Sequence, residues 1–260
     1  MIDLAKVMEE VKPLVVKVGD MQKDTLGKQG LKMHSKSTCI DIVTEVDKRS
    51  EEIIIDFITK HYPEHDILAE ESGLSGGAAD YRWVVDPLDG TTNFAQGLPI
   101  FSVSVALEYK GETVLGVVYT PVVGQLFTAI RGQGAYLNGK KLHVSEKTDL
   151  IESVLATGFP YDKASHAANN LVYFNALIVK TRAIRRFGSA AYDLACTATG
   201  TFDGYWEMNL SPWDVAAGIL LVEEAGGKVV HFRQDRKISI IAGNEVMVKK
   251  IHDEILQLGS

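Results

Sequence analysis

The side chains most able to carry chemistry in this chain are carboxylates that stand beside apolar runs. They form four clusters: Asp41 with Asp47, Glu70 with Glu71, Asp86 with Asp89, and Asp214. Carboxylate oxygens are the ligands that hard divalent cations such as Mg²⁺ prefer. Two such ions roughly 3.5–4 Å apart can hold a phosphoryl group for in-line attack by water. The clusters therefore suggest metal-dependent phosphate chemistry.

Each cluster also has a purely structural explanation. Thr44-x-x-Asp47 fits a capping box at a helix start, and Glu70 with Glu71 can form a solvated strand end. Residues 87–90, PLDG, suit a type I turn. Residues 211–214, SPWD, suit a helix start with a Ser N-cap, Pro at the first helical position and Asp near the positive end of the dipole. Taken singly, each structural explanation is favoured.

The positions of the acidic residues along the chain favour a shared site. Glu70, Asp86 and Asp214 each stand at the end of a predicted strand or the start of a predicted helix, where open α/β sheets bind ligands. Asp86 and Asp89, three residues apart across a Pro-initiated turn, can direct two carboxylates to one point. Residues 90–92, GTT, then offer backbone N–H groups to a phosphate.

Three other motifs fit known sites only in part. Residues 134–141 nearly match a phosphate-binding loop, but the last position is lysine instead of Ser or Thr, and Asn138-Gly139 predicts a hairpin turn. Residues 73–77 match G-x-S-x-G but follow a polar segment, so a flexible loop is favoured. His61 and His65 have the spacing of a zinc pair, yet Pro63 interrupts the helix between them. We expect both histidines to be solvated.

Composition and charge restrict the classes of partner. The 260 residues are 46% hydrophobic and 23% charged, with a formal net charge of −7, which argues against nucleic acid or an anionic membrane as the main partner. The two cysteines, Cys39 and Cys196, are far apart, so neither a structural disulfide nor a thiolate zinc site is expected. Two widely spaced cysteines are typical of a protein in the reducing cytoplasm, so we expect a cytoplasmic location. No apolar run approaches the ~18–20 residues of a membrane span.

The N-terminal part of the chain mixes helices with strands. Residues 1–22 and 44–63 have apolar residues at helical intervals, and the lysine-rich segment between them predicts a loop. Residues 66–72 and 81–86 predict short strands that end in acid. From Phe101 to about Val144, strand patterns separated by turn signals predict an antiparallel meander.

Beyond about residue 150, strand-like and helix-like segments alternate, which is typical of an α/β arrangement. The expected fold class is therefore α+β with an antiparallel sheet in the N-terminal half and a mixed α/β C-terminal half. We expect two subdomains, 1–148 and 149–260, the first carrying most of the acidic clusters and the second carrying Asp214.

Four segments together resemble one known family. DIVTEVD (41–47), LAEESG (68–73), WVVDPLDGTTNF (83–94) and PWDVAAGILLVEEAGG (212–227) are similar, in this order, to the inositol monophosphatase family of Mg²⁺-dependent, lithium-sensitive sugar-phosphate phosphatases. RRFGSAAYDLA (185–195) and FDGYWE (202–207) resemble the substrate-side segments of that family. The resemblance covers nearly the whole chain and implies an alternating αβαβα layered sandwich.

The resemblance also implies roles for the metal-side residues. The first Mg²⁺ would be held by Glu70, Asp86 and the carbonyl of Leu88, and the second by Asp86, Asp89 and Asp214. A third ion near Glu70 is usual in the family.

The implied catalytic residues are Asp47, Thr91 and Glu70. Thr91, hydrogen-bonded to Asp47, would position and help deprotonate the attacking water. The backbone around Gly90, Thr91 and Thr92 would bind the phosphate. The resemblance further implies a set of residues that hold the sugar or inositol hydroxyls: Asp89, Gly188, Ser189, Ala190, Glu207 and Asp214. Lys36 lies on a segment that folds over the site in the family.

The activity implied is hydrolysis of myo-inositol monophosphate or a related small sugar phosphate. Fructose 1,6-bisphosphate, NADP and 3′-phosphonucleotides are alternative substrates of the same site, and Glu207 with the 160–190 region would decide between them. A different alternative is a phosphatase fold with an added role in binding transcription or processing machinery. The expected partner is a small phosphorylated polyol or sugar, and the expected assembly is a homodimer.

Overall fold

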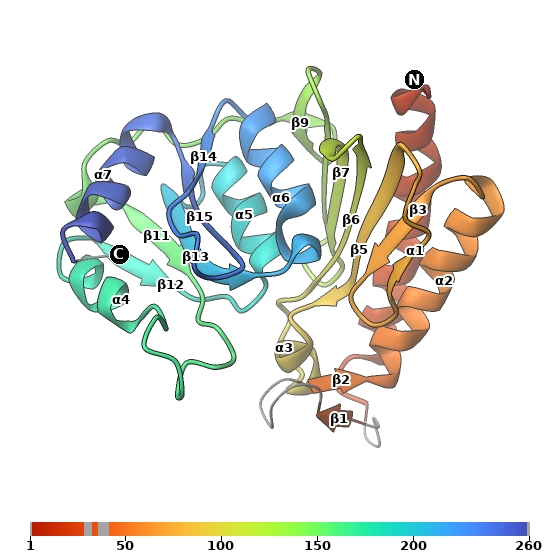
Figure 1. The fold of residues 1–260 in the computed structure, drawn as a ribbon, viewed down its shortest axis with the longest axis horizontal. Coiled ribbons are helices and arrows are strands. Elements are labelled where there is room, and N and C mark those ends of the chain that lie inside the picture. Colours follow the sequence, from red (N-terminus) through yellow and green to blue (C-terminus); the bar gives the residue numbers. More distant parts are fainter. Residues whose placement is uncertain (1, 29–32, 36–41, 259–260) are drawn as a thin grey trace.

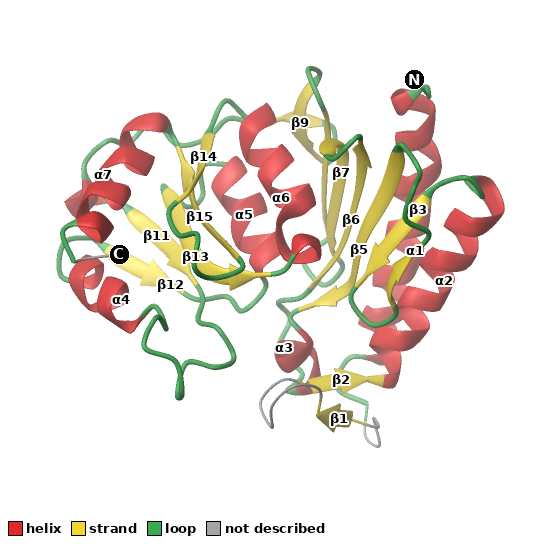
Figure 2. Cartoon of the chain, in the orientation of Figure 1, coloured by secondary structure: helices red, strands yellow, loops and turns green. Residues whose placement is uncertain are grey.

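The computed structural model describes residues 2–28, 33–35 and 42–258, so Lys36, Cys39 and Asp41 lie outside the described residues. The chain forms five alternating layers of helices and sheets (Figure 1; Figure 2). One outer layer holds α1 (Leu4–Thr25) and α2 (Glu45–His61), the middle layer holds α5 (Ala190–Ala198) and α6 (Pro212–Glu224), and the other outer layer holds α4 (Leu171–Ile178) and α7 (Glu245–Leu256). The αβαβα prediction is confirmed.

The first sheet has eight strands in the order β10-β9-β8-β7-β6-β5-β3-β4. Its strands are β3 (Asp66–Ala69), β4 (Gly73–Ser75), β5 (Tyr81–Asp89), β6 (Ser102–Tyr109), β7 (Glu112–Thr120), β8 (Gln125–Ile130), β9 (Gly134–Leu137) and β10 (Lys140–Lys141). Strands β5 to β10 pair antiparallel in chain order, which confirms the meander, while β3 and β5 pair in parallel. Asn138-Gly139 joins β9 to β10, as the hairpin signal predicted.

The second sheet has five strands in the order β12-β11-β13-β15-β14. They are β11 (Val154–Thr157), β12 (Ala183–Arg185), β13 (Gly204–Leu210), β14 (Lys228–His231) and β15 (Ile238–Gly243). β11 is parallel to both β12 and β13, whereas β15 is antiparallel to β13 and β14. This mixed sheet is the expected C-terminal arrangement.

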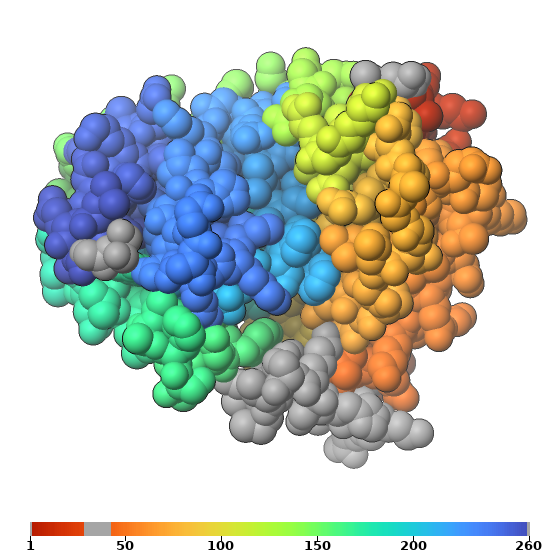
Figure 3. Space-filling model, in the orientation of Figure 1, coloured from red at the N-terminus to blue at the C-terminus, as the bar shows by residue number. Residues whose placement is uncertain are grey.

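The two sheets share the helical layer between them. α6 contacts β5, β6 and β7 of the first sheet and β14 and β15 of the second. Its buried Ala217 and Leu221 belong to the same apolar cluster as Val118 of β7 and Ile240 of β15. In the space-filling view, the light-blue residues around 210–220 abut the orange residues around 65–90 on this face (Figure 3). The division into subdomains at residue 148 stays a prediction.

Three local predictions were wrong. The segment after residue 22 is not all loop, because α1 continues to Thr25 and β1 (Met33–Ser35) pairs with β2 (Ile42–Thr44). Residues 73–75 form β4, which pairs with β3, instead of a flexible loop. His65 is half-buried: its Nδ1 accepts a hydrogen bond from Trp83 Nε1 at 3.1 Å, and its ring stacks on Tyr81.

The start of α2 is confirmed as a capping box, in which the side chain of Thr44 accepts from the Asp47 amide and Asp47 accepts from the Thr44 amide. α2 ends at His61, two residues before Pro63. In the part of the chain that the structure describes, no helix combines the length and the apolar character needed to span a membrane.

Candidate active site

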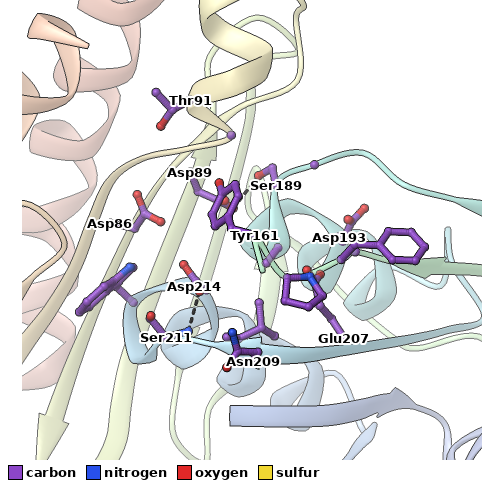
Figure 4. Close-up of a pocket in the computed structure, with 18 of the residues that line it drawn as sticks. Asp86, Asp89, Thr91, Tyr161, Ser189, Asp193, Glu207, Asn209, Ser211 and Asp214 are labelled. Carbon is purple, nitrogen blue, oxygen red and sulfur yellow. Dashed lines mark hydrogen bonds between the residues drawn. The ribbon is translucent and has the colours of Figure 1, made fainter. Parts of the chain in front are cut away.

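A cavity of about 410 Å³ lies where the ends of the two sheets meet (Figure 4). One wall, called here the acidic wall, comes from Glu70, the end of β5 and the starts of α3 (Thr91–Ala95) and α6. The opposite wall comes from residues 158–162, residues 186–193 and the end of β13. It is called the hydroxyl wall, because it contains the residues expected to hold substrate hydroxyl groups. The cavity therefore gathers the predicted acidic residues and the predicted substrate-side segments.

A β-bulge, and not the expected type I turn, brings Asp86 and Asp89 to the same side of β5. Asp86 pairs with Ser104 of β6 and Asp89 pairs with Ser102, so three steps on β5 face two steps on β6. Side chains alternate along a regular strand, and two residues three apart would point to opposite faces. The extra residue at Pro87-Leu88 reverses that alternation, so both carboxylates line the cavity.

Asp86 is almost completely buried on the acidic wall. The amide of Leu88 donates to Asp86 Oδ1 at 3.1 Å and orients the carboxyl group. Burial, followed by the neighbouring carboxylates of Glu70, Asp89 and Asp214, holds the pKa of Asp86 well above its usual range. Four carboxyl groups are thus close enough to oppose one another's ionisation at this point of the cavity.

Asp89 connects the acidic wall to the start of α5. Its Oδ2 accepts from Ser189 Oγ at 2.7 Å and from the Ala191 amide at 2.8 Å. Burial raises the pKa of Asp89 to about 6, although these hydrogen bonds act in the opposite direction. The carboxylate therefore accepts from the first turn of a helix while it lines the cavity.

Asp214 lies in the first turn of α6, as the SPWD segment predicted, and it also completes a capping box with Ser211, which was not predicted. Its Oδ2 accepts from the Ser211 amide at 2.6 Å, and Pro212 is the first residue of the helix. Burial and then the charge of Asp89 raise the pKa of Asp214 well above its usual range. The structural explanation of this residue is correct, and Asp214 also lines the cavity with the other carboxylates.

The acidic wall has the donor chemistry of a site for hard cations. Among the described residues, no three His, Cys, Asp or Glu side chains already converge on one point. Carboxylates that repel one another this strongly need positive charge between them in order to converge. The described lining has carboxylate oxygens and the Leu88 backbone, and it contains no cysteine or histidine. This donor set fits Mg²⁺ and does not fit a soft metal.

Thr91 and Asp47 lie at the edge of the acidic wall and form the hydrogen bond that was predicted between them. Thr91 Oγ1 is 2.8 Å from Asp47 Oδ1 and 3.0 Å from the Leu88 carbonyl. The hydroxyl has one proton, and a carboxylate is the stronger acceptor. Donation to Asp47 leaves the hydroxyl lone pairs and the Leu88 carbonyl available to other groups. Asp47 itself is buried behind the cavity lining.

Gly90 permits the close approach of the two walls at the start of α3. Its φ is +96°, and an added Cβ would lie 3.2 Å from the carbonyl oxygens of Gly188 and Ile100. Thr92, which was predicted to bind phosphate, is exposed and is not part of the cavity lining. Asn93 was not predicted, although its Nδ2 donates to Phe187 O at 2.6 Å and so ties α3 to the hydroxyl wall.

Glu207 lies on the hydroxyl wall as predicted, together with Gly188, Ser189 and Ala190. Tyr205 Oη donates to Glu207 Oε2 at 2.7 Å. Burial raises the pKa of Glu207 to about 7, against the opposing effects of Tyr205 and Arg186. The carboxylate occupies the space beside Gly158, where an added Cβ would lie 2.0 Å from Glu207 Oε1. Glycine at position 158 is therefore a condition for this placement of Glu207.

The lining also contains residues that were not predicted individually: Gly158, Phe159, Pro160, Tyr161, Asp162, Arg186, Asp193 and Lys237. Four of them, from Pro160 to Asp162 and Arg186, fall in the 160–190 region that was expected to decide substrate choice. Asp193 is buried, and burial followed by the charge of Glu207 raises its pKa well above the usual range. Arg186 and Asp193 belong to the segment RRFGSAAYDLA, so the sequence marked their neighbourhood. Residues 158–162 and Lys237 carry no motif that would have identified them.

Comparisons with known proteins show the family of this chain. A family model described as "Inositol monophosphatase family" matches residues 3–258. The protein named "Nus factor SuhB" of Escherichia coli (strain K12) is 50% identical over 214 residues, which cover 80% of this chain and 80% of that protein.

Two solved structures have closely similar folds. Extragenic suppressor protein suhB from Bartonella henselae has a TM-score of 0.88 at 40% identity and covers 96% of this chain and 98% of its own. Inositol monophosphatase from Anabaena has a TM-score of 0.88 at 38% identity and covers 98% of this chain and 96% of its own. The chain described here belongs to the inositol monophosphatase family.

Proposed function

We propose that this protein is a Mg²⁺-dependent phosphomonoesterase that acts on myo-inositol monophosphate or a related small sugar phosphate. One observation carries the proposal: Glu70, Asp86, Asp89 and Asp214 line a single cavity, and the buried Thr91–Asp47 hydrogen bond lies at its edge. Membership of the inositol monophosphatase family supports the same activity.

Two or three Mg²⁺ ions would be held by Glu70, Asp86, Asp89, Asp214 and the Leu88 carbonyl. When bound, they would polarise the phosphoryl oxygens and lower the pKa of a coordinated water. A backbone amide holds one carboxylate oxygen of Asp86 and one of Asp214. Orientation of the carboxylates by neighbouring amides favours a defined geometry over a mobile one.

The water that attacks phosphorus would be placed by Thr91. Its hydroxyl donates to Asp47, so its lone pairs can accept a hydrogen bond from the water. Asp47 would accept the proton through Thr91 as the water loses it, and Glu70 lines the same cavity. The backbone amides of Gly90 and Thr91 would contact the phosphate.

The alcohol part of the substrate would lie against the hydroxyl wall. Glu207 can accept hydrogen bonds from its hydroxyl groups, and Asp89, Asp214 and residues 188–190 line the adjoining surface. Polar acceptors of this kind discriminate strongly against analogues that lack the hydroxyl groups. This wall therefore favours polyol and sugar esters.

The test is phosphate release by the purified protein across a panel of esters, with Mg²⁺ and with EDTA. The panel contains myo-inositol 1-phosphate, fructose 1,6-bisphosphate, NADP and a 3′-phosphonucleotide. We expect the highest kcat/KM for the inositol ester and no turnover in EDTA. Equal rates on all four esters would defeat the inositol assignment. The same assays test inhibition by lithium, and sedimentation tests the expected homodimer.

The names of the relatives support a second candidate role. Several curated relatives with 47–50% identity are named "Nus factor SuhB", which favours contact with the transcription machinery. A pulldown of transcription proteins with wild-type protein and with Asp89→Asn separates the roles. A binding role should survive the substitution, whereas hydrolysis should not. Cytoplasmic localisation and the absence of a nucleic-acid substrate remain parts of the proposal.

A further inference from the structure

The hydroxyl wall depends on a segment without helix or strand, residues 158–170, which leads from β11 to α4 (Figure 1). Residues 158–162 of this loop line the cavity, and Tyr161 is labelled beside it in Figure 4. A wall of this kind selects substrates only if something outside the loop fixes its position.

The two ends of the 158–170 loop are held together by Asn170. Its Nδ2 donates to the Gly158 carbonyl and to Thr157 Oγ1, and its Oδ1 accepts from Trp206 Nε1 at 2.7 Å. Asn170 is buried, so these contacts are shielded from water. They close the loop at its base and leave its middle to be held by other residues.

The middle of the loop is held by Arg236, a side chain on the β14–β15 connection. Arg236 Nη2 donates to both carboxylate oxygens of Asp162 at 2.8 Å, and Nη1 donates to the Ala168 carbonyl at 2.9 Å. Its Nε lies 3.3 Å from Oδ1 of Asn209, a cavity residue in the bulge of β13. The Arg236 side chain is only 5% exposed and is not part of the cavity lining.

We infer that Arg236 is a positioning residue that sets the shape of the hydroxyl wall through Asp162, Ala168 and Asn209, and so determines which alcohol groups the cavity accepts. The inference deepens the proposed function and rests on it. The planar guanidinium donates to three residues on two segments at once, which the single ammonium of lysine cannot reproduce. The carboxylates of the acidic wall are oriented by other contacts, so the hydrolytic step itself does not depend on Arg236.

The test compares Arg236→Gln, Arg236→Lys, Asp162→Asn and the double variant Arg236→Gln/Asp162→Asn. Two substrates are used: myo-inositol 1-phosphate and p-nitrophenyl phosphate, which lacks the hydroxyl groups. Since small misplacements in a binding site weaken substrate positioning strongly, we expect KM for the inositol ester to rise about tenfold in Arg236→Gln. The kcat for the inositol ester, and both kcat and KM for p-nitrophenyl phosphate, should stay within about twofold of wild type. The KM of Arg236→Lys for the inositol ester should lie between those of wild type and Arg236→Gln. The KM of the double variant should not exceed that of the poorer single variant.

Arg233→Gln is the matched control. Arg233 lies on the same connection and is 11% exposed, but it donates to Asp235 and to Tyr173 Oη, not to the 158–170 loop. Amide hydrogen exchange gives a readout that is independent of activity. Exchange in residues 158–170 should increase in Arg236→Gln and not in Arg233→Gln.

Unchanged exchange in Arg236→Gln would overturn the inference, and so would an equal loss on both esters or the same KM rise in Arg233→Gln. Faster exchange without a KM change for the inositol ester would also overturn it. If wild-type protein hydrolysed no ester, the proposed function would fail, and the exchange result would still show whether Arg236 holds the loop.

Discussion

The acidic wall and the hydroxyl wall of the cavity are held by different kinds of contact. On the acidic wall, Asp86 accepts from an amide two residues away and Asp214 from an amide three residues away. On the hydroxyl wall, Asp162 is held by Arg236, 74 residues further along the chain, and Asn170 is bonded to Trp206, 36 residues away. Local contacts thus orient Asp86 and Asp214, whereas distant contacts hold the 158–170 loop of the hydroxyl wall.

This difference suggests that chemistry and substrate choice can be changed separately. A carboxylate oriented by its own strand or helix keeps its direction when a distant loop moves. A loop held by side chains from other strands shifts when any one of those contacts is removed. Two contacts on the acidic wall are distant instead: Thr91 donates to Asp47, 44 residues away, and Asp89 accepts from Ser189, 100 residues away, and thus joins the two walls.

The largest effect should come from removal of a metal ligand on the acidic wall. Asp214→Asn keeps an oxygen that can accept from the Ser211 amide but removes the charge that would hold Mg²⁺. We expect kcat/KM to fall by roughly 10³-fold, because the charge stabilisation that a bound ion supplies is worth several kcal/mol. Steady-state phosphate release measures the loss.

The fold should persist in this variant, since it removes one charge from a repelling group of carboxylates. Circular dichroism provides the control, and Glu70→Gln and Asp89→Asn should behave in the same way. Phosphate release that continued unchanged in EDTA would show the metal mechanism to be wrong.

A smaller loss of roughly 10²-fold in kcat is expected for Thr91→Ala, because this change removes the hydroxyl that would place the attacking water. Thr91→Ser keeps the hydroxyl and is the matched control, with activity within a few-fold of wild type. Rapid-quench measurement of a single turnover reports the hydrolytic step directly. Equal activity of the alanine and serine variants would exclude Thr91 from the reaction.

Substitutions on the hydroxyl wall should change KM for the inositol ester and leave kcat unchanged. In Gly158→Ala the new Cβ would lie 2.0 Å from Glu207 Oε1, so the Glu207 side chain must move away. Loss of a hydrogen bond to a charged group predicts a rise in KM of roughly tenfold for myo-inositol 1-phosphate. The KM for p-nitrophenyl phosphate should not change. Glu207→Gln is the comparison, and a loss of kcat on both esters would contradict the separation of the walls.

The smallest effect concerns the pH dependence of stability in metal-free protein. The folded-state pKa of Glu207, about 7, lies above its ordinary value of 4.5, so the folded protein binds more protons than the unfolded chain between these values. The free energy of unfolding therefore decreases as pH rises through this window. In Glu207→Gln this decrease should be shallower by up to about 1.4 kcal/mol per pH unit.

Urea denaturation in EDTA at pH 5 and pH 8 measures the pH effect. The other buried carboxylates titrate in both proteins, but the charge of Glu207 raises the pKa of Asp193 and of Asp214. The difference between wild type and variant therefore reports Glu207 together with its effect on these two neighbours. Parallel stability curves for the two proteins would mean that Glu207 does not titrate in this window.

The sequence was sufficient for α1, α2, the start of α6, the antiparallel meander and the acidic residues of the cavity. Helix caps such as Thr44 with Asp47 and Ser211 with Asp214 depend on residues three positions apart, and apolar periodicity depends on the nearest turns. Such signals are local, so they can be recognised without knowledge of the fold. The family resemblance added the functional reason for the carboxylates.

The tertiary structure alone decided how those carboxylates are presented. The segment DPLDG predicted a turn, and only its pairing with β6 shows a bulge that places Asp86 and Asp89 on one side of β5. His65 was expected in solvent, but it lies against Trp83 and Tyr81 because the β3–β5 pairing brings these segments together.

The hydroxyl wall was the least predictable part of the site. Gly158, Asp162 and Arg236 carry no motif, and each has its role only because β11, β13 and the β14–β15 connection meet at one end of the sheet. The sequence by itself determined which groups could perform the chemistry, because the segments that carry them are recognisable locally and the amides that orient Asp86 and Asp214 are two and three residues away. The fold determined which alcohol can approach them, because that surface is assembled from contacts between distant segments.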